Sequence, residues 1–248
     1  MGSRLKLSAS LIAAAILTAH SAFAADLPAQ PVYKAPVAVV AQTWTGFYVG
    51  ANGGWARSHN CWVFDPATTA NSEGCHNGDG AVAGGQIGYN WQTGRTVFGL
   101  EAAGDWANLK GSNESVSFPG NFNQTKVDAI GMFTGRLGWA AWNSTLLYVK
   151  GGAAVTHNKY LATTLVPVTS ATSSDTRWGW VAGAGIEYAF APNWSIAGEY
   201  DYLDMGSKVV RFGDFTGGFF CTATCQERIN QRVHMVTARL NYRFWTGR

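Results

Sequence analysis

Cysteines and histidines are the residues of this chain best suited to carry chemistry. The four cysteines lie in two local pairs, and beyond the N-terminal segment there are four histidines: Cys61 with Cys75, Cys221 with Cys225, and His59, His76, His157 and His234. Thiolates and imidazoles bind metal ions, whereas thiols in an oxidising compartment form disulfides. The compartment therefore decides which chemistry applies.

The N-terminus indicates export. Arg4 and Lys6 precede an apolar run at 11–19, and the small residues Ala22 and Ala24 suit a cut before Ala25. This pattern predicts a secretory signal peptide over residues 1–24, with an apolar stretch too short to cross a bilayer. An uncleaved anchor is the alternative.

An exported chain with an even cysteine count predicts disulfides. Three pairings of the four cysteines are open, and we expect the local one, Cys61–Cys75 and Cys221–Cys225. The first bridge is worth about 3 kcal/mol on the loop-entropy model. Neither pair has the repeated CxxC spacing of a zinc site, so we expect no metal.

Two further sets of residues suggest a cofactor or a reaction. The histidines, with Tyr160, could ligate haem iron, or they are ordinary polar loop residues; we expect no cofactor and keep haemin as the alternative. Glu101 with Asp105, or Glu199 with Asp201, could form catalytic carboxylate pairs, but structural ion pairing is the interpretation we favour. The sequence contains no nucleophile elbow, P-loop, HExxH or dinucleotide fingerprint, so we expect no enzyme.

The elements that position these residues are predicted to be β-strands. Thirty glycines in 248 residues is about 12%, against an average near 7%. After the signal peptide no apolar run reaches the ~18 residues of a transmembrane helix. Losing residues 1–24 removes Arg4 and Lys6 and no acid, so Lys+Arg falls from 18 to 16 against 15 acids. A net charge so near zero argues against a nucleic-acid partner.

Alternating segments separated by long and short connections predict an all-β fold, an eight-stranded antiparallel up-and-down transmembrane barrel. Residues 25–43 are Pro-rich and predict a periplasmic linker, and residues 44–248 the outer-membrane barrel. The expected strands are 44–57, 80–92, 96–108, 125–140, 145–158, 176–190, 194–207 and 231–244. The expected long outer loops are 58–79, 109–124, 159–175 and 208–230, which places every histidine on the outer side.

The two faces of these strands differ in charge. The more apolar register has no formal charge, as a lipid-facing surface requires. The other register carries Glu101, Asp105, Arg136, Lys150, Glu187, Glu199, Asp201, Arg239 and Arg243. In a soluble barrel the aromatic face would be the core, but it would overfill so narrow a lumen. We therefore expect a salt-bridged lumen plug and not an open channel.

Tryptophans gather at the expected strand ends, which predicts aromatic girdles at the two headgroup levels. The periplasmic girdle is expected to contain Trp44, Trp91, Trp139, Trp142, Trp194 and Trp245, and the outer girdle Trp55, Trp106, Trp178 and Trp180. Trp62 is expected in a loop.

Several stretches resemble the small major outer-membrane proteins of rhizobia and their pathogenic relatives: "ADLP", "WTGFYVGANGGWA", "GGQIGYNWQ", "FGLEAAGDWA" and "ARLNYRF". The resemblance covers the mature chain and implies a porin-like barrel of the bacterial outer membrane, acting in envelope structure and surface interaction. A small channel and a haemin receptor are the alternatives. The implied partners are outer-membrane lipid and lipopolysaccharide, the barrel assembly machinery and an unidentified extracellular molecule.

Overall fold

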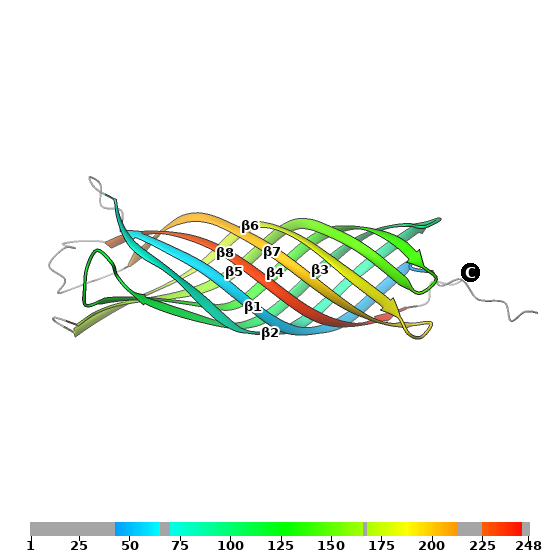
Figure 1. Cartoon of the computed structure of the whole chain (residues 1–248), viewed down its shortest axis with the longest axis horizontal. Helices are drawn as coiled ribbons and strands as arrows, with labels where there is room; N and C mark the ends of the chain where they lie inside the picture. Colours follow the sequence, from blue (N-terminus) through cyan, green and yellow to red (C-terminus); the bar gives the residue numbers. More distant parts are fainter. Residues whose placement is uncertain (1–42, 65–69, 166–167, 213–224, 245–248) are drawn as a thin grey trace, which may run out of the picture. The chain divides into compact units, whose positions relative to one another are not determined.

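The chain folds into eight β-strands, seen in a computed structural model that describes residues 43–64, 70–165, 168–212 and 225–244 (Figure 1). The strands are β1 Gly46–Phe64, β2 Asn71–Thr93, β3 Thr96–Glu114, β4 Asn121–Trp142, β5 Thr145–Leu165, β6 Val168–Ala189, β7 Trp194–Phe212 and β8 Cys225–Arg243. None of the described residues belongs to a helix long and apolar enough to span a membrane.

Each strand pairs with its neighbours in sequence, always antiparallel, and the sheet closes on itself. Closure joins β1 to β8, which lie side by side in Figure 1, from Tyr48 opposite Arg243 to Phe64 opposite Glu227. Tight turns link the strands at one end, and Gly94, with φ of 60°, supplies the left-handed residue that the turn between β2 and β3 needs. The predicted antiparallel eight-stranded barrel is confirmed.

Burial alternates along the strands as a closed barrel requires. Along β3, Phe98 and Leu100 are about half exposed, whereas Val97 before them and Glu101 after them are buried. The same alternation exposes Phe133 and Leu137 on β4 and Val236 and Leu240 on β8. The apolar register therefore faces outward, and the register with the charges faces the lumen.

The strands run much further than predicted. They contain 19–23 residues, against the ~9–11 that a tilted membrane strand needs. Most residues of the four expected long loops, at 58–79, 109–124, 159–175 and 208–230, are strand, and those loop assignments are corrected accordingly. In these outer segments the sequence loses its apolar alternation although the hydrogen-bonded ladder continues.

The ladder is incomplete in this outer part. Pairs join β6 to β7 only from Ala189 opposite Ser195 to Trp180 opposite Asp204, although both strands continue outward. Within the described residues, the outer portions of β6 and β7 therefore have edges that face each other without a backbone ladder.

A disulfide joins Cys61 to Cys75, as predicted. The two residues are direct cross-strand neighbours on β1 and β2, with Cα atoms 4.1 Å apart. The second predicted bridge cannot be placed, since Cys221 and the side chain of Cys225 lie outside the described residues. The predicted signal peptide and most of the linker lie outside them too, as does Trp245.

A single substitution by arginine tests whether the outward face of the barrel contacts lipid. Phe133, 60% exposed, lies between Ala102 and Ala153 in the membrane-spanning part of the sheet. We expect Phe133→Arg to lower the free energy of unfolding by about 2–4 kcal/mol, because a charge near the bilayer midplane loses its hydration. Urea unfolding in lipid vesicles measures this. Phe122→Arg, in the outer part of β4, is the matched control, and equal losses would contradict the assignment.

Candidate functional site: the filled lumen

The lumen is filled by layers of inward-facing side chains, and these layers are the candidate functional site. From the tight-turn end outward they are an apolar cap, a charged layer, a long apolar layer, a polar layer and a second apolar layer. Each strand contributes to several of them because every second residue points inward. β8, for example, supplies Arg239, Met235, Gln231 and Ile229 in that order, all buried.

Arg239 lies at the centre of the charged layer. Its two terminal nitrogens contact different acids, Nη1 at 2.5 Å from Glu199 Oε2 and Nη2 at 2.8 Å from Glu101 Oε1. Lys150 Nζ lies 2.5 Å from Glu199 Oε1 and 3.1 Å from Asp201 Oδ1. The contact between Arg239 on β8 and Glu101 on β3 therefore links, across the lumen, two strands that are far apart in the sequence.

A second group of contacts surrounds Arg136. Its Nη2 lies 2.7 Å from Glu187 Oε2, and its guanidinium stacks 3.9 Å from the ring centre of Tyr148. Two tyrosines that the sequence reading missed complete the layer, because Tyr48 donates to Glu101 (2.8 Å) and Tyr148 to Glu199 (2.6 Å). Their position in the lumen register was the signal that could have identified them.

Two of the nine predicted lumen residues lie outside this cluster. Arg243 is 4.0 Å from Glu187 and donates mainly to the backbone oxygen of Thr43, at 2.6 Å. Asp105 is buried beside the side chain of Asn52 and makes no salt bridge with a described residue. The structure therefore brings seven of the nine together, as ion pairs whose side chains are at most 3% exposed.

Trp44 is not part of the periplasmic girdle, and its assignment is corrected. It is fully buried and packs in the apolar cap with Val97, Leu146 and Tyr148. Its backbone N–H donates to the side chain of Gln92, and the Arg243 guanidinium lies 4.5 Å from its ring centre. These contacts hold the indole across the lumen entrance. The other described girdle tryptophans are exposed: Trp55, Trp91, Trp106, Trp139, Trp142, Trp178, Trp180 and Trp194.

The long apolar layer was not predicted. It contains Ile130, Met132, Leu203, Val233 and Met235, each at most 6% exposed, with smaller neighbours. These residues continue the lumen register beyond the charges, as in the sequence Asp201, Leu203. Because these side chains are apolar, the sequence does not show that they face the lumen, whereas charge marks the other lumen residues. They separate the charged layer from the outer half of the barrel.

The outer half carries a polar layer and then an aromatic one. Gln231 donates to Asn158, at 2.9 Å, and Arg177 donates to the backbone oxygen of Ile229, at 2.8 Å. Trp62 is fully buried on β1 and contacts Tyr160 and Phe212 at ring-centre distances of 5.7 and 5.8 Å. Trp62 is therefore a lumen residue of a strand and not a loop residue.

The four histidines lie in separate hydrogen-bonding environments. His76 is buried, with Nδ1 2.7 Å from Asn113 Oδ1 and Nε2 3.0 Å from Thr125 Oγ1, and burial lowers its pKa. The others are at the surface: His59 contacts Asn77, His157 contacts Thr176, and His234 contacts Tyr200.

Among the residues that the structure describes, one group could hold a metal by position: His59 with Cys61 and Cys75. The two sulfurs are joined in the disulfide, so neither is a thiolate that could ligate zinc. Tyr160, the other candidate haem ligand, is buried against Trp62, and burial raises its pKa to about 12. Its phenol is therefore held neutral.

Comparison with known proteins agrees with this geometry. The family described as outer membrane protein beta-barrel domain matches residues 9–244. The chain belongs to this family. The 31 kDa outer-membrane immunogenic protein of Brucella melitensis is 33% identical over 246 residues, which is 94% of this chain and 98% of that protein. The 22 kDa outer membrane protein of Rhizobium leguminosarum bv. viciae is 32% identical, covering 72% and 74%.

Among solved structures, the outer membrane protein OprG from Pseudomonas aeruginosa aligns with a TM-score of 0.50 and 11% identity, over 81% of this chain and 97% of that one. At this identity the likeness concerns the fold alone. With the family established, the barrel is an integral outer-membrane protein, its apolar register faces lipid, and the resemblance noted in the sequence is confirmed.

The charged layer should contribute strongly to stability. Arg239→Ala leaves Glu101 and Glu199 without their shared partner, and removing one member of a buried pair costs about 3–5 kcal/mol. Urea unfolding in vesicles measures the loss. Arg57→Ala is the control, because that side chain is 61% exposed and its ion-pair partner within the described residues is Asp79. A loss of similar size in both variants would show that the lumen ion pairs contribute no more to the free energy of unfolding than a surface ion pair does.

His76 should make the outer half of the barrel sensitive to acid. Folding lowers the pKa of His76, so the unfolded state binds the proton more readily than the folded state. The contribution of His76 to the free energy of unfolding is therefore fully present above about pH 6.5 and decreases as the pH falls below that value. We expect hydrogen exchange of the amides near His76 to accelerate at pH 5 relative to pH 7.5, after correction for intrinsic rates. His76→Gln should remove this difference, and an unchanged difference would exclude His76 as its source.

Proposed function

We propose that this protein is a closed, non-conducting barrel that anchors an interaction surface outside the cell and catalyses no reaction. The observation that carries the proposal is the filling of the lumen. A permeating ion would have to cross the long apolar layer, whose methionine, leucine, isoleucine and valine side chains offer no replacement for its hydration shell; Asp105, opposite Ile130, adds one carboxylate to this layer. It would also have to separate ion pairs that have no access to water.

The outer strand portions support a role in surface contact. β6 and β7 extend beyond their last backbone pair, Trp180 opposite Asp204, as facing edges linked by side chains. Lys208 donates to Asp175 at 2.6 Å, and Ser173 donates to the backbone oxygen of Arg211 at 3.2 Å. Strand edges can accept an added strand from another molecule. The Brucella relatives are named outer-membrane immunogenic proteins, which fits exposure at the surface.

The chemistry of the candidate residues supports a role without catalysis or cofactor. Glu101 and Glu199, which could have acted as acid or base, are held by Arg239 and a tyrosine hydroxyl each. The histidine that lies closest to the outer aromatic layer, His76, uses both ring nitrogens in hydrogen bonds within the fold. Neither set offers free groups that converge on a ligand, so a haemin receptor remains a secondary candidate function. The filled lumen makes a small channel a secondary candidate as well.

Planar-bilayer recording tests the closed lumen. The refolded protein should show no stable ohmic steps, whereas changing Met132, Leu203 and Met235 to serine should produce them, because the dry barrier becomes small and polar. Changing the outward-facing Val236, Leu240 and Ile196 to serine is the control and should leave the bilayer silent. Stable steps from the unaltered protein would overturn the proposal.

A further inference from the structure

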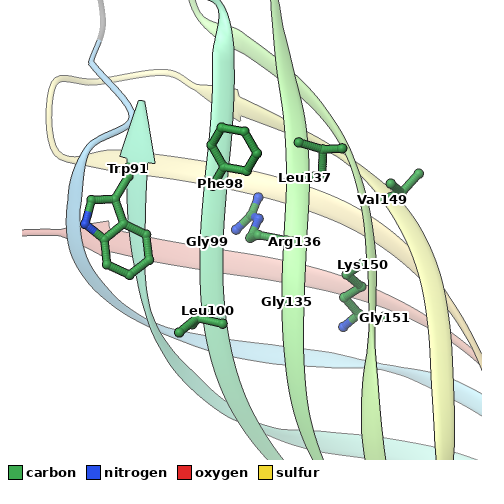
Figure 2. Close-up of a pocket in the computed structure, with 10 residues that line it drawn as sticks. All are labelled: Trp91, Phe98, Gly99, Leu100, Gly135, Arg136, Leu137, Val149, Lys150 and Gly151. Carbon is green, nitrogen blue, oxygen red and sulfur yellow. The ribbon is translucent and has the colours of Figure 1, made fainter. Parts of the chain in front are cut away.

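Three hollows lie along one outer face of the barrel, on β3, β4 and β5 with their neighbours. The outermost, of about 430 Å³, is lined by Gln124, Lys126, Lys159 and Thr172. The next, of about 450 Å³, is lined by Gly104, Trp106, Gly131 and Val155. The innermost, also about 450 Å³, lies over Leu100, Gly135 and Gly151 (Figure 2). The three form a track from the lipid-facing surface to the outer strand ends.

The polar end of the track carries a ladder of lysines. Lys110, Lys126 and Lys159 are direct cross-strand neighbours on β3, β4 and β5, and all three face outward. Like charges placed opposite each other repel, so the arrangement lowers stability unless an anion compensates it. Asp128, in an irregularity of β4, lies 2.7 Å from both Lys126 and Lys159. Within the described residues Lys110 has no ion-pair partner; the acid directly opposite it on β2 is Asp79, whose carboxylate lies 2.5 Å from Arg57.

Two other outward-facing bases each lie beside an acid on the neighbouring strand. Arg57 Nε lies 2.5 Å from Asp79 Oδ1, and Arg232 Nε lies 3.9 Å from Asp204 Oδ2. The cross-strand row that contains the ladder runs through Arg57, Asp79, Lys110, Lys126 and Lys159, with Asp128 beside the last two, so it holds four bases and two acids. An excess of two positive charges therefore remains beside a hollow that is also lined by Thr172 and Ser174.

The depth of the ladder suits a lipid phosphate. Trp106, 79% exposed, marks the outer girdle on β3. Lys110 lies four residues further out, which at ~3.3 Å per residue and a tilt near 40° is about 10 Å above the girdle. This is the level of headgroup phosphates and sugars and not of the acyl chains.

The innermost hollow lies at acyl depth and is apolar, and the middle one lies at the level of the girdle, where Trp106, His157 and Thr176 line it. They exist because outward positions on three adjacent strands carry glycine. A Cβ at Gly104 would meet no atom within 4 Å, and one at Gly135 would meet only backbone oxygens at 4.0 Å. Gly135 and Gly151 lie side by side, with Leu100 next to Gly135 and Trp91 beyond (Figure 2). The space they leave is bounded by Phe98, Leu137 and Val149.

We propose that this face is a binding site for one phosphorylated, multiply acylated lipid of the outer leaflet, the chemical class of lipopolysaccharide. The lysine ladder binds its phosphates, the hydroxyl-lined hollow accepts the sugar beside them, and the two glycine hollows accept acyl chains. Charge and depth favour this occupant over a protein, which would meet the ladder but not the hollows below it. The inference does not rest on the closed lumen.

The test is a titration of the detergent-solubilised, folded full-length barrel with purified lipopolysaccharide, followed by microscale thermophoresis. Changing Lys110, Lys126 and Lys159 to glutamine should weaken binding at least tenfold. The charge-matched control changes Arg211, Arg228 and Arg232, exposed bases on β7 and β8, to glutamine and should weaken it less than threefold. Equal effects in the two variants would overturn the proposal.

Two further arms separate the parts of the ligand. Lipopolysaccharide stripped of phosphate, or of acyl chains, should each bind at least tenfold more weakly, and unchanged affinity for either would overturn the proposal. Gly135→Leu should weaken binding by filling the inner hollow. Gly198→Leu, on the lipid-facing side of β7 where a Cβ also meets nothing within 4 Å, is its control and should not. Heat-modifiable migration on gels verifies that each variant is folded.

Discussion

The structure depends on one constraint: inside the bilayer no water is available to satisfy a polar group, so every such group must find a partner within the chain. The backbone meets this by closing the sheet through β1 and β8. The lumen charges meet it by pairing, with Arg239 placed between Glu101 and Glu199. Eight strands leave little room for these groups. A Cβ at Gly88 would lie 2.4 Å from the Tyr48 hydroxyl, and one at Gly185 would lie 2.4 Å from the Tyr148 ring. Glycine in the lumen register is therefore what admits the tyrosines and the ion pairs they support.

The same constraint explains which parts of the fold could be predicted. Where one face meets lipid, alternation is enforced, and the sequence identified the eight strands and the inward side of residues such as Arg136 and Glu187. Beyond the girdles both faces tolerate polar residues. The ladder continues there through segments such as 71–80, in which glycine and polar residues leave no apolar period. In the sequence, the outer portions of the strands therefore resemble loops.

The lumen contents were predictable only as far as charge marks them. Met132 and Met235 lie in the correct register, but an apolar residue between lumen charges and outer polar residues carries no sign of its direction. Trp44 shows a second limit. Its type and its place before β1 are those of a girdle residue, and its inward direction is fixed by Gln92 and Arg243, the latter nearly the length of the chain away. The residue types that surround Trp44 in the sequence do not reveal long-range contacts of this kind.

Inward and outward chemistry alternate along the same strands. On β4, Arg136 joins the charged layer while Gly135 beside it opens the lipid-facing hollow, and on β5 Lys150 and Gly151 are related in the same way. The ion pairs connect the strands across the lumen and so hold the backbone that shapes the hollow outside. A glycine at such a position contributes no packing of its own, and the hollow keeps its form only because the neighbouring inward residue is fixed. The charged layer thus serves the outer surface of the barrel as well as its interior.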